Sequence, residues 1–306
     1  MQFQRKVLLK RLIYKLTSAP VWKLERNRKY PIRDSVTQLL PTLEDPGTPQ
    51  EAPILAVLCM PSQFSDALWS AWSWYRFLQG QVKLWICCDG EILKKDREIA
   101  ATLLPNARII SLADLWEELD LSVRGIEKIE SHPLSRKLKL ILGLQSKYDL
   151  LYSDCDVLAF NEPHKLKQIM ELNNVCAYMV ETHDVSPSQL LQSRSLKLGY
   201  SFDRLLNSGL LYLSKNSLNP TIVTDFLEDW QPPLEEWTLE QWLLANMISR
   251  SKSYPLDSSR YVISGQRQFW HQIDVEYENI VCRHFTNPVR HVMYCKGMPA
   301  ILKSLR

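Results

Sequence analysis

The sequence has no run of about 18 consecutive apolar residues, so it predicts no membrane-spanning helix. It has seven cysteines but no C-x-x-C, and several of them lie in apolar, strand-like runs. This odd set argues against a disulfide framework and against a zinc site, and it favours free thiols in a reducing compartment. The N-terminus has neither an uninterrupted apolar segment nor a small-residue cleavage site, so we expect a cytoplasmic protein.

Three common catalytic motifs are also missing. The sequence contains no Gly-rich phosphate loop, no G-x-S-x-G and no H-E-x-x-H, so nothing in it indicates a P-loop NTPase, an α/β-hydrolase or a zincin. Only nine glycines occur in 306 residues, and no segment repeats, which excludes collagen-like and solenoid proteins. The composition, with 45% apolar and 23% charged residues, is that of an ordinary globular protein.

Positive charge is concentrated at the N-terminus. Residues 1–33 hold ten Lys/Arg and one acid, a net charge of +9, whereas the whole chain carries +3 and the remainder therefore −6. Residues 3–17 place apolar side chains close to helical spacing and predict a helix with one apolar and one basic face. Such a helix either contacts an anionic membrane or packs on its own domain or on a second subunit. The acidic remainder argues against nucleic acid as a partner.

Prolines mark the next boundary. Five prolines and one glycine fall between residues 31 and 53, and they predict a linker or an extended strap rather than one regular element. We therefore expect a basic helical arm at 1–30, a Pro-rich linker at 31–51 and one large domain at 52–306.

Within the large domain, apolar runs alternate with helical patterns. The first half predicts strands at 52–60, 82–90, 107–112 and 150–160 and helices at 66–80, 91–103 and 135–148. The second half predicts strands at 176–182, 208–215 and 280–285 and helices at 221–230 and 238–249. The alternation is typical of βαβ units in an open, mainly parallel α/β sheet with helices on its faces.

The fourth predicted strand, LLYSDCDVLAF at 150–160, carries two carboxylates near its carboxyl end, where ligands bind in open α/β sheets. Side chains i and i+2 of an extended strand share a face, so Asp154 and Asp156 should converge while Cys155 points into the core. A divalent cation would offset their repulsion. The pair predicts a metal that bridges a nucleotide diphosphate, a phosphatase of the haloacid dehalogenase type, or two merely exposed carboxylates. The phosphatase is disfavoured because three strands precede the motif and no G-D-x-x-x-D follows it.

Three further motifs follow the D-x-D in order: LLNSGLLYLSK at 205–215, LEQWLLANMIS at 239–249 and RHFTNPVRH at 283–291. With the K-L-K-L at 137–140, this series resembles the nucleotide-sugar glycosyltransferases of the GT-A type, and most closely the retaining enzymes of glycosyltransferase family 8. The resemblance spans residues 52–297. It implies the GT-A fold, with a mixed, mainly parallel central sheet flanked by helices. The chain departs from the family pattern at Glu240, Asn287 and Arg290, where the family has Asp, Gly and Lys.

The resemblance also implies ligands for a metal and a diphosphate. Asp154, Asp156 and His284 would hold the metal, and two carboxylates with one imidazole suit Mn²⁺ and accept Mg²⁺. Cations are needed where charge develops on a departing diphosphate. The residues that would supply them are Lys137, Arg290 and Lys296.

Further positions are implied around the sugar. Asn207 would bind hydroxyls of the donor sugar or of the acceptor, and Gly209 would let the backbone pass close to the sugar. Gln241 would lie under the anomeric carbon, with Glu240 beside it. Asp89, at the end of the second predicted strand, either contacts the nucleoside or forms a turn. The sugar-binding carboxylate that GT-A enzymes often have would be Glu181 or Asp184.

The predicted function is transfer of a hexose from a nucleoside-diphosphate sugar, with a UDP-sugar favoured, to a hydroxyl of a glycan, lipid or small molecule. Retention of the anomeric configuration is implied by the resemblance, although Glu240 as a general base would instead permit inversion. Two alternatives stay open: a catalytically silent GT-A-fold scaffold, motivated by the altered H-x-x-N-x-x-R, and a phosphatase.

Overall fold

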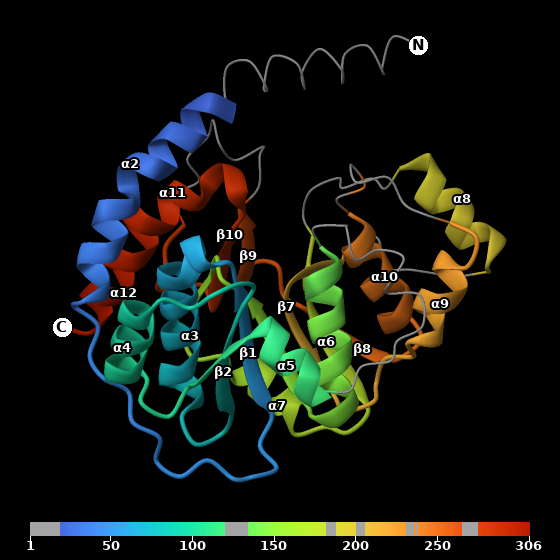
Figure 1. Ribbon diagram of the computed structural model, residues 1–306, viewed down its shortest axis with the longest axis horizontal. Coiled ribbons are helices and arrows are strands. Elements are labelled where there is room, and N and C mark those ends of the chain that lie inside the picture. Colours follow the sequence, from blue (N-terminus) through green and yellow to red (C-terminus); the bar gives the residue numbers. More distant parts are fainter. Residues whose placement is uncertain are drawn as a thin grey trace.

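The computed structural model describes residues 19–119, 134–181, 188–199, 206–230, 236, 238–264 and 275–306. Figure 1 shows them as a central sheet covered by helices. The helix predicted at 3–17 and the candidate carboxylate Asp184 lie outside these ranges.

A seven-stranded sheet with the order β3-β2-β1-β4-β7-β6-β8 forms the centre. Its strands are β1 (Ile54–Cys59), β2 (Lys83–Cys88), β3 (Arg108–Ser111), β4 (Leu150–Asp154), β6 (Val175–Val180), β7 (Leu206–Leu213) and β8 (Lys252–Leu256). All neighbouring pairs are parallel except those that β7 makes with β4 and β6, which are antiparallel. The mixed, mainly parallel sheet predicted from the sequence is confirmed.

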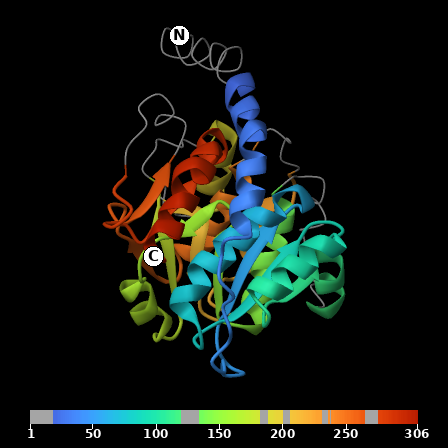
Figure 2. The same ribbon diagram turned by 90° about the vertical axis from the view of Figure 1, so that its left-hand side faces the viewer.

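Helices cover both faces of the sheet (Figures 1 and 2). They are α2 (Ala19–Thr37), α3 (Phe64–Leu78), α4 (Lys94–Leu103), α5 (Leu112–Leu119), α6 (Ser135–Lys147), α7 (His164–Met170), α8 (Gln189–Lys197), α9 (Thr221–Leu227), α10 (Leu239–Ile248), α11 (Arg290–Val292) and α12 (Met298–Ser304). Among the described residues, no helix is both long and apolar enough to cross a membrane.

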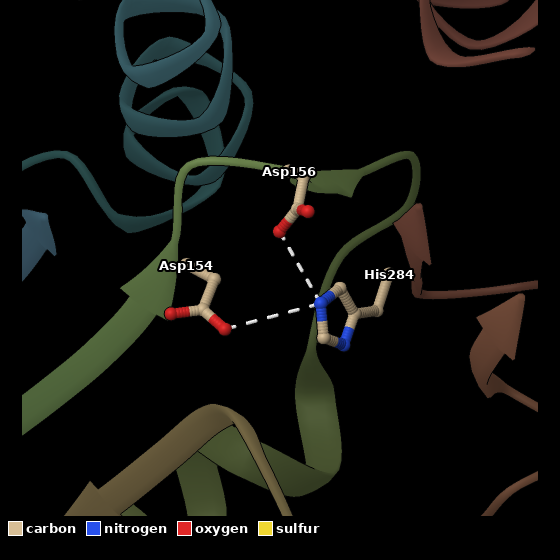
Figure 3. A group of neighbouring side chains, drawn as sticks. All are labelled: Asp154, Asp156 and His284. Carbon is tan, nitrogen blue, oxygen red and sulfur yellow. Dashed lines mark ion pairs between the residues drawn. The ribbon is translucent and has the colours of Figure 1, made fainter. Parts of the chain in front are cut away.

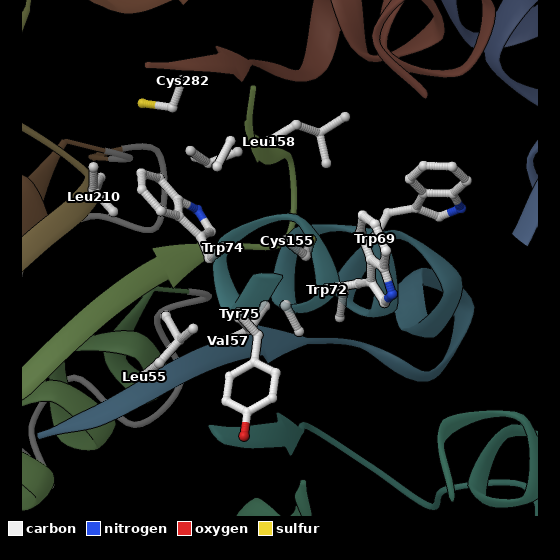
Figure 4. Close-up of a cluster of buried hydrophobic side chains, with 14 of the residues drawn as sticks. Leu55, Val57, Trp69, Trp72, Trp74, Tyr75, Cys155, Leu158, Leu210 and Cys282 are labelled. Carbon is white, nitrogen blue, oxygen red and sulfur yellow. The ribbon is translucent and has the colours of Figure 1, made fainter. Parts of the chain in front are cut away.

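Each face of the sheet has its own apolar core, because successive strand residues point to opposite faces. On β1, Leu55 and Val57 join the core under α3, whereas Ile54 and Ala56 join the core on the side of α6 and α10. The α3 core contains three buried tryptophans, at 69, 72 and 74, all carried by α3 and labelled in Figure 4. Burial on both faces explains why these strands read as continuous apolar runs.

The predicted strand 150–160 is wrong as a single element. β4 ends at Asp154, residues 155–156 form a turn, and β5 (Val157–Ala159) belongs to a second sheet. That sheet has the order β5-β10-β9, with β9 at Tyr261–Ser264 and β10 at Cys282–Phe285. The chain leaves the central sheet here because the carbonyl of Asp156 accepts a hydrogen bond from the Phe285 amide at 2.8 Å. The turn therefore places the second aspartate next to β10.

The N-terminal segment packs on the domain. α2 continues through Pro31 to Thr37, seven residues beyond the end expected for the helical arm. Its last residue accepts a hydrogen bond from Trp69 Nε1 at 2.8 Å, and the following Leu40 belongs to the α3 core. α2 also contacts α11, so segments near the two ends of the chain lie side by side (Figures 1 and 2). The Pro-rich stretch is thus an ordered strap from α2 to β1.

Candidate metal centre

A pocket of about 350 Å³ opens at the carboxyl ends of β1, β2 and β4. Among the residues predicted from the sequence, those that line it are Asp89, Lys137, Asp154, Asp156, His284 and Arg290. Among the described residues, this lining does not include Asn207, Gly209, Glu240, Gln241 or Lys296. The predicted residues therefore divide into a set that faces the pocket and a set that does not.

Three side chains meet in this pocket (Figure 3). His284 Nε2 lies 3.2 Å from Asp156 Oδ1 and 3.9 Å from Asp154 Oδ2. One potential ligand atom from each residue lies within 4.8 Å of the other two. Convergence comes from the turn after β4 and from the pairing of β10 with β5, not from the extended i, i+2 geometry that the sequence suggested.

Asn207 sets the orientation and the tautomer of His284. Its Nδ2 donates to Glu181 Oε2 at 2.8 Å, and its Oδ1 accepts from the Gly209 amide at 2.9 Å, which fixes the direction of the side-chain amide. The same Oδ1 lies 3.1 Å from His284 Nδ1. An oxygen there accepts the Nδ1 proton, so Nε2 is the nitrogen that faces the aspartates and binds either a proton or a metal ion, as in metal-binding histidines. Asn207 thus contacts the imidazole rather than the pocket.

Gly209 makes room for the same ring. A Cβ at this position would lie 2.5 Å from both Cε1 and Nδ1 of His284, closer than real Cβ contacts. The glycine is therefore required by the histidine. The close passage of a sugar, for which the resemblance implied it, stays a prediction.

Electrostatics favour a cation at His284 Nε2. Burial alone would lower the pKa of His284, but Asp156 and Asp154 outweigh burial and raise it. Burial likewise acts to raise the pKa of Asp156, yet Arg290 and His284 hold it well below the usual range. Asp156 thus stays ionised and attracts either a proton or a metal ion to the imidazole.

Each aspartate is held by a further partner. Asp156 Oδ2 accepts from Arg290 Nη2, which leaves Oδ1 facing His284. Asp154 Oδ1 accepts from the Tyr152 hydroxyl at 2.7 Å and lies 3.0 Å from Lys137 Nζ. Outer contacts of this kind orient metal ligands, so two carboxylate oxygens and one imidazole nitrogen fit a divalent cation such as Mn²⁺ or Mg²⁺.

Lys137 connects this centre to a buried layer behind it. Its ammonium donates to Ser208 Oγ at 3.0 Å and lies 3.6 Å from Glu240 Oε1. Burial acts to lower the pKa of Lys137, but Asp154 and Glu240 raise it, so the group stays charged. Glu240 is 4% exposed, and burial raises its pKa. The Glu240 carboxylate therefore interacts with Lys137 and Ser208.

The other predicted residues have separate surroundings. Gln241 Nε2 donates to the carbonyl of Leu206 at 2.6 Å. Lys296 lies in the π-helical turn Met293–Gly297 that follows α11. Neither side chain lines the pocket, so the roles implied for them at the anomeric carbon and at the diphosphate have no support from their positions.

The sequence did not point to two pocket residues. Arg136, at the start of α6, donates to Asp89 Oδ2 across the pocket, and Tyr152 precedes Asp154 by two residues on β4. Their only signals were the position of Arg136 beside Lys137 and the i, i+2 spacing of Tyr152 from Asp154. A basic residue beside a lysine and a tyrosine two residues before an aspartate are also common outside functional sites, so neither pattern identifies a pocket residue.

Comparison with known proteins places the fold. No family model and no curated protein sequence matches the chain. Mouse xyloside xylosyltransferase 1, in its apo form, is similar with a TM-score of 0.51 and 11% identity over 78% of this chain and 99% of that one. The galactosyltransferase LgtC, in complex with donor and acceptor sugar analogues, is similar with a TM-score of 0.51 and 13% identity over 82% of this chain and 95% of that one. The chain thus has the GT-A fold of nucleotide-sugar glycosyltransferases, as the sequence resemblance implied. Membership of family 8 stays a prediction.

Proposed function

We propose that the protein is a metal-dependent glycosyltransferase that moves a hexose from a nucleoside-diphosphate sugar to a hydroxyl acceptor. The observation that carries the proposal is the meeting of Asp154, Asp156 and His284 in a pocket at the carboxyl edge of a GT-A sheet. LgtC, which shares the fold, binds donor and acceptor sugar analogues. We favour UDP as the nucleotide, Mn²⁺ as the metal and retention of configuration, all on the sequence resemblance.

In this proposal the chain's own groups prepare a diphosphate site. A bound divalent cation would neutralise charge that develops on the departing diphosphate. Asp154, Asp156 and His284 would hold that cation, and Asn207 would keep a proton on His284 Nδ1, so that Nε2 is the nitrogen that binds it. Arg290 would keep Asp156 ionised and oriented. Asp89 and Arg136, at the far side of the pocket, would contact the nucleoside.

The same contacts argue against the phosphatase alternative. A nucleophilic carboxylate must reach its substrate, but the Asp156 side chain is 5% exposed and is paired with both Arg290 and His284. The Asp154 side chain is 25% exposed, but it is held by Tyr152 and Lys137. Phosphate release from a generic aryl phosphate is therefore not expected.

Calorimetry with Mn²⁺ and UDP tests the proposal. Wild type should bind Mn²⁺ and should bind UDP more tightly when Mn²⁺ is present, whereas Asp156→Ala should lose both effects. Asp257→Ala serves as the control, because Asp257 is exposed in the turn before β9. Equal and weak UDP binding by wild type and Asp156→Ala, with or without metal, would refute the proposal. A folded wild type that binds UDP with Mn²⁺ but turns over no donor would favour the silent scaffold.

The cellular context stays as predicted from the sequence. We expect a cytoplasmic protein, with residues 3–17 either contacting an anionic membrane or packing on protein. All seven cysteines lie in described segments as free thiols, six of them buried, which supports a reducing compartment.

A further inference from the structure

A line of buried charges runs from α2 to the candidate metal centre. It begins at Arg33, which is 8% exposed, and continues through Asp66 of α3, which is 1% exposed. Arg33 Nη1 lies 3.4 Å from Asp66 Oδ1. The other Asp66 oxygen accepts a hydrogen bond from the Tyr294 hydroxyl at 2.9 Å. A carboxylate this deeply buried requires such partners, since an unpaired buried charge is strongly destabilising.

Arg290 pairs with Asp156 and also interacts electrostatically with Asp66. It precedes Tyr294 by four residues on consecutive helical turns, so the two side chains share a face. Because Tyr294 bonds Asp66, that face is turned toward Asp66. Burial raises the pKa of Asp66, and the strongest opposing influence is Arg290, ahead of Arg33. Arg290 therefore has two carboxylates near it but pairs directly with Asp156.

The two guanidinium groups of Arg33 and Arg290 thus balance the charges of two buried carboxylates, Asp66 and Asp156. If Arg33 were removed, Asp66 would keep Arg290 as the nearest cation. The guanidinium of Arg290 would then be drawn from Asp156, whose Oδ1 would no longer be held toward His284. Arg33 also donates to the carbonyl of Ser62 at 3.3 Å, in the short helical turn Pro61–Gln63 beside the pocket.

We propose that Arg33 is a positioning residue of the metal centre: by pairing with Asp66 it leaves Arg290 on Asp156. The inference rests on the proposed metal-dependent function. It also makes α2 part of the catalytic domain rather than part of a separable arm. Arg33 acts through Arg290 and contacts neither the metal ligands nor the pocket.

The test is Mn²⁺ affinity measured by calorimetry at about pH 8, well above the ordinary pKa of a carboxyl group. Arg33→Met should weaken Mn²⁺ binding by about tenfold, the lower end of the range for outer contacts of a metal site. Arg33→Lys should retain most of the affinity. The double variant Arg33→Met/Asp66→Asn should recover it, because a neutral residue 66 no longer competes for Arg290.

Arg194→Gln is the matched control, because Arg194 binds the backbone carbonyl of Phe226 at 2.9 Å and does not line the pocket. It should bind Mn²⁺ like wild type. Thermal melting of each variant separates loss of fold from loss of binding. Normal Mn²⁺ affinity in Arg33→Met, or no recovery in the double variant, would overturn the role of Arg33 while leaving the proposed function intact. Absence of Mn²⁺ binding by wild type would overturn both.

Discussion

Gly209 offers the sharpest test of the link between fold and metal centre. In Gly209→Ala the new methyl group would lie 2.5 Å from Cε1 and Nδ1 of His284, whereas ordinary contacts begin at 3.4 Å. The ring would have to retreat by about 0.9 Å, the difference between these two distances. It has little room to do so, because the His284 side chain is 9% exposed and β10 pairs with strands on both sides.

This displacement of the His284 ring should have two separate effects, one on the stability of the fold and one on Mn²⁺ binding. Overpacking of this kind destabilises a fold by about 1–3 kcal/mol, so the melting temperature should fall by several degrees. The 3.1 Å contact between Asn207 Oδ1 and His284 Nδ1 would lengthen beyond hydrogen-bond range. Loss of that orienting bond should weaken Mn²⁺ binding by about 10- to 100-fold.

The assay is calorimetric titration with Mn²⁺ beside thermal melting, with Gly297→Ala as the control. There the added methyl group would meet Phe285 Cζ at 2.9 Å, so it should lower the melting temperature and leave Mn²⁺ affinity near wild type. A Gly209→Ala protein that melts lower but binds Mn²⁺ like wild type would show that His284 is not a ligand. An unchanged melting temperature would contradict the steric argument itself.

The remaining predictions concern charge and the N-terminal segment. Lys137→Met should destabilise the fold by about 3 kcal/mol in urea denaturation, because it leaves buried carboxylates unpaired. Lys139→Met is the control, since the Lys139 ammonium lies 4.1 Å from the ring centre of Trp116, and it should lose less stability. A larger loss in Lys139→Met than in Lys137→Met would refute the argument. Since the aspartates raise the folded-state pKa of His284 above its ordinary value of 6.5, the imidazolium stabilises metal-free protein at low pH, and this stability is lost as pH rises through the folded-state pKa. Mn²⁺ should therefore raise the melting temperature more at higher pH, and an equal shift at every pH would contradict a His284 ligand. A chain that starts at residue 53 should melt lower than the full chain and bind a hydrophobic dye, since it loses Leu40 from the core. If the full chain and a chain that starts at residue 19 co-sediment equally with anionic liposomes, the membrane contact predicted for residues 3–17 is wrong.

Local patterns were enough to predict much of the sheet. Apolar runs located β1, β2 and β4 to within two residues at their N-terminal ends, because buried parallel strands need apolar residues on both faces. The D-x-D was expected at the carboxyl edge of the sheet, and Asp154 lies there. These features depend on residues that are close together in the sequence, so a single sequence is enough to predict them.

Features that depend on distant contacts were not predicted. The split between β4 and β5 requires pairing with β10, more than a hundred residues away. The Pro-rich composition left a linker and an extended strap both open, and the contacts with α3 make the stretch after α2 a strap. The ion pair of Arg290 with Asp156 was not predicted, and the diphosphate contact expected of Arg290 stays a prediction. Which buried charge pairs with which depends on the assembled core.

The contact of α2 with α11 affects how the chain folds during and after its synthesis. The hydrogen bond between Asp66 and Tyr294 joins residues 228 positions apart, so Arg33 and Asp66 are synthesised long before the helix that completes their surroundings. Contacts of such separation slow folding, because the intervening chain must be ordered first. A chain cut short before residue 290 would therefore leave Asp66 without its hydrogen bond from Tyr294 and α2 without its contacts to α11.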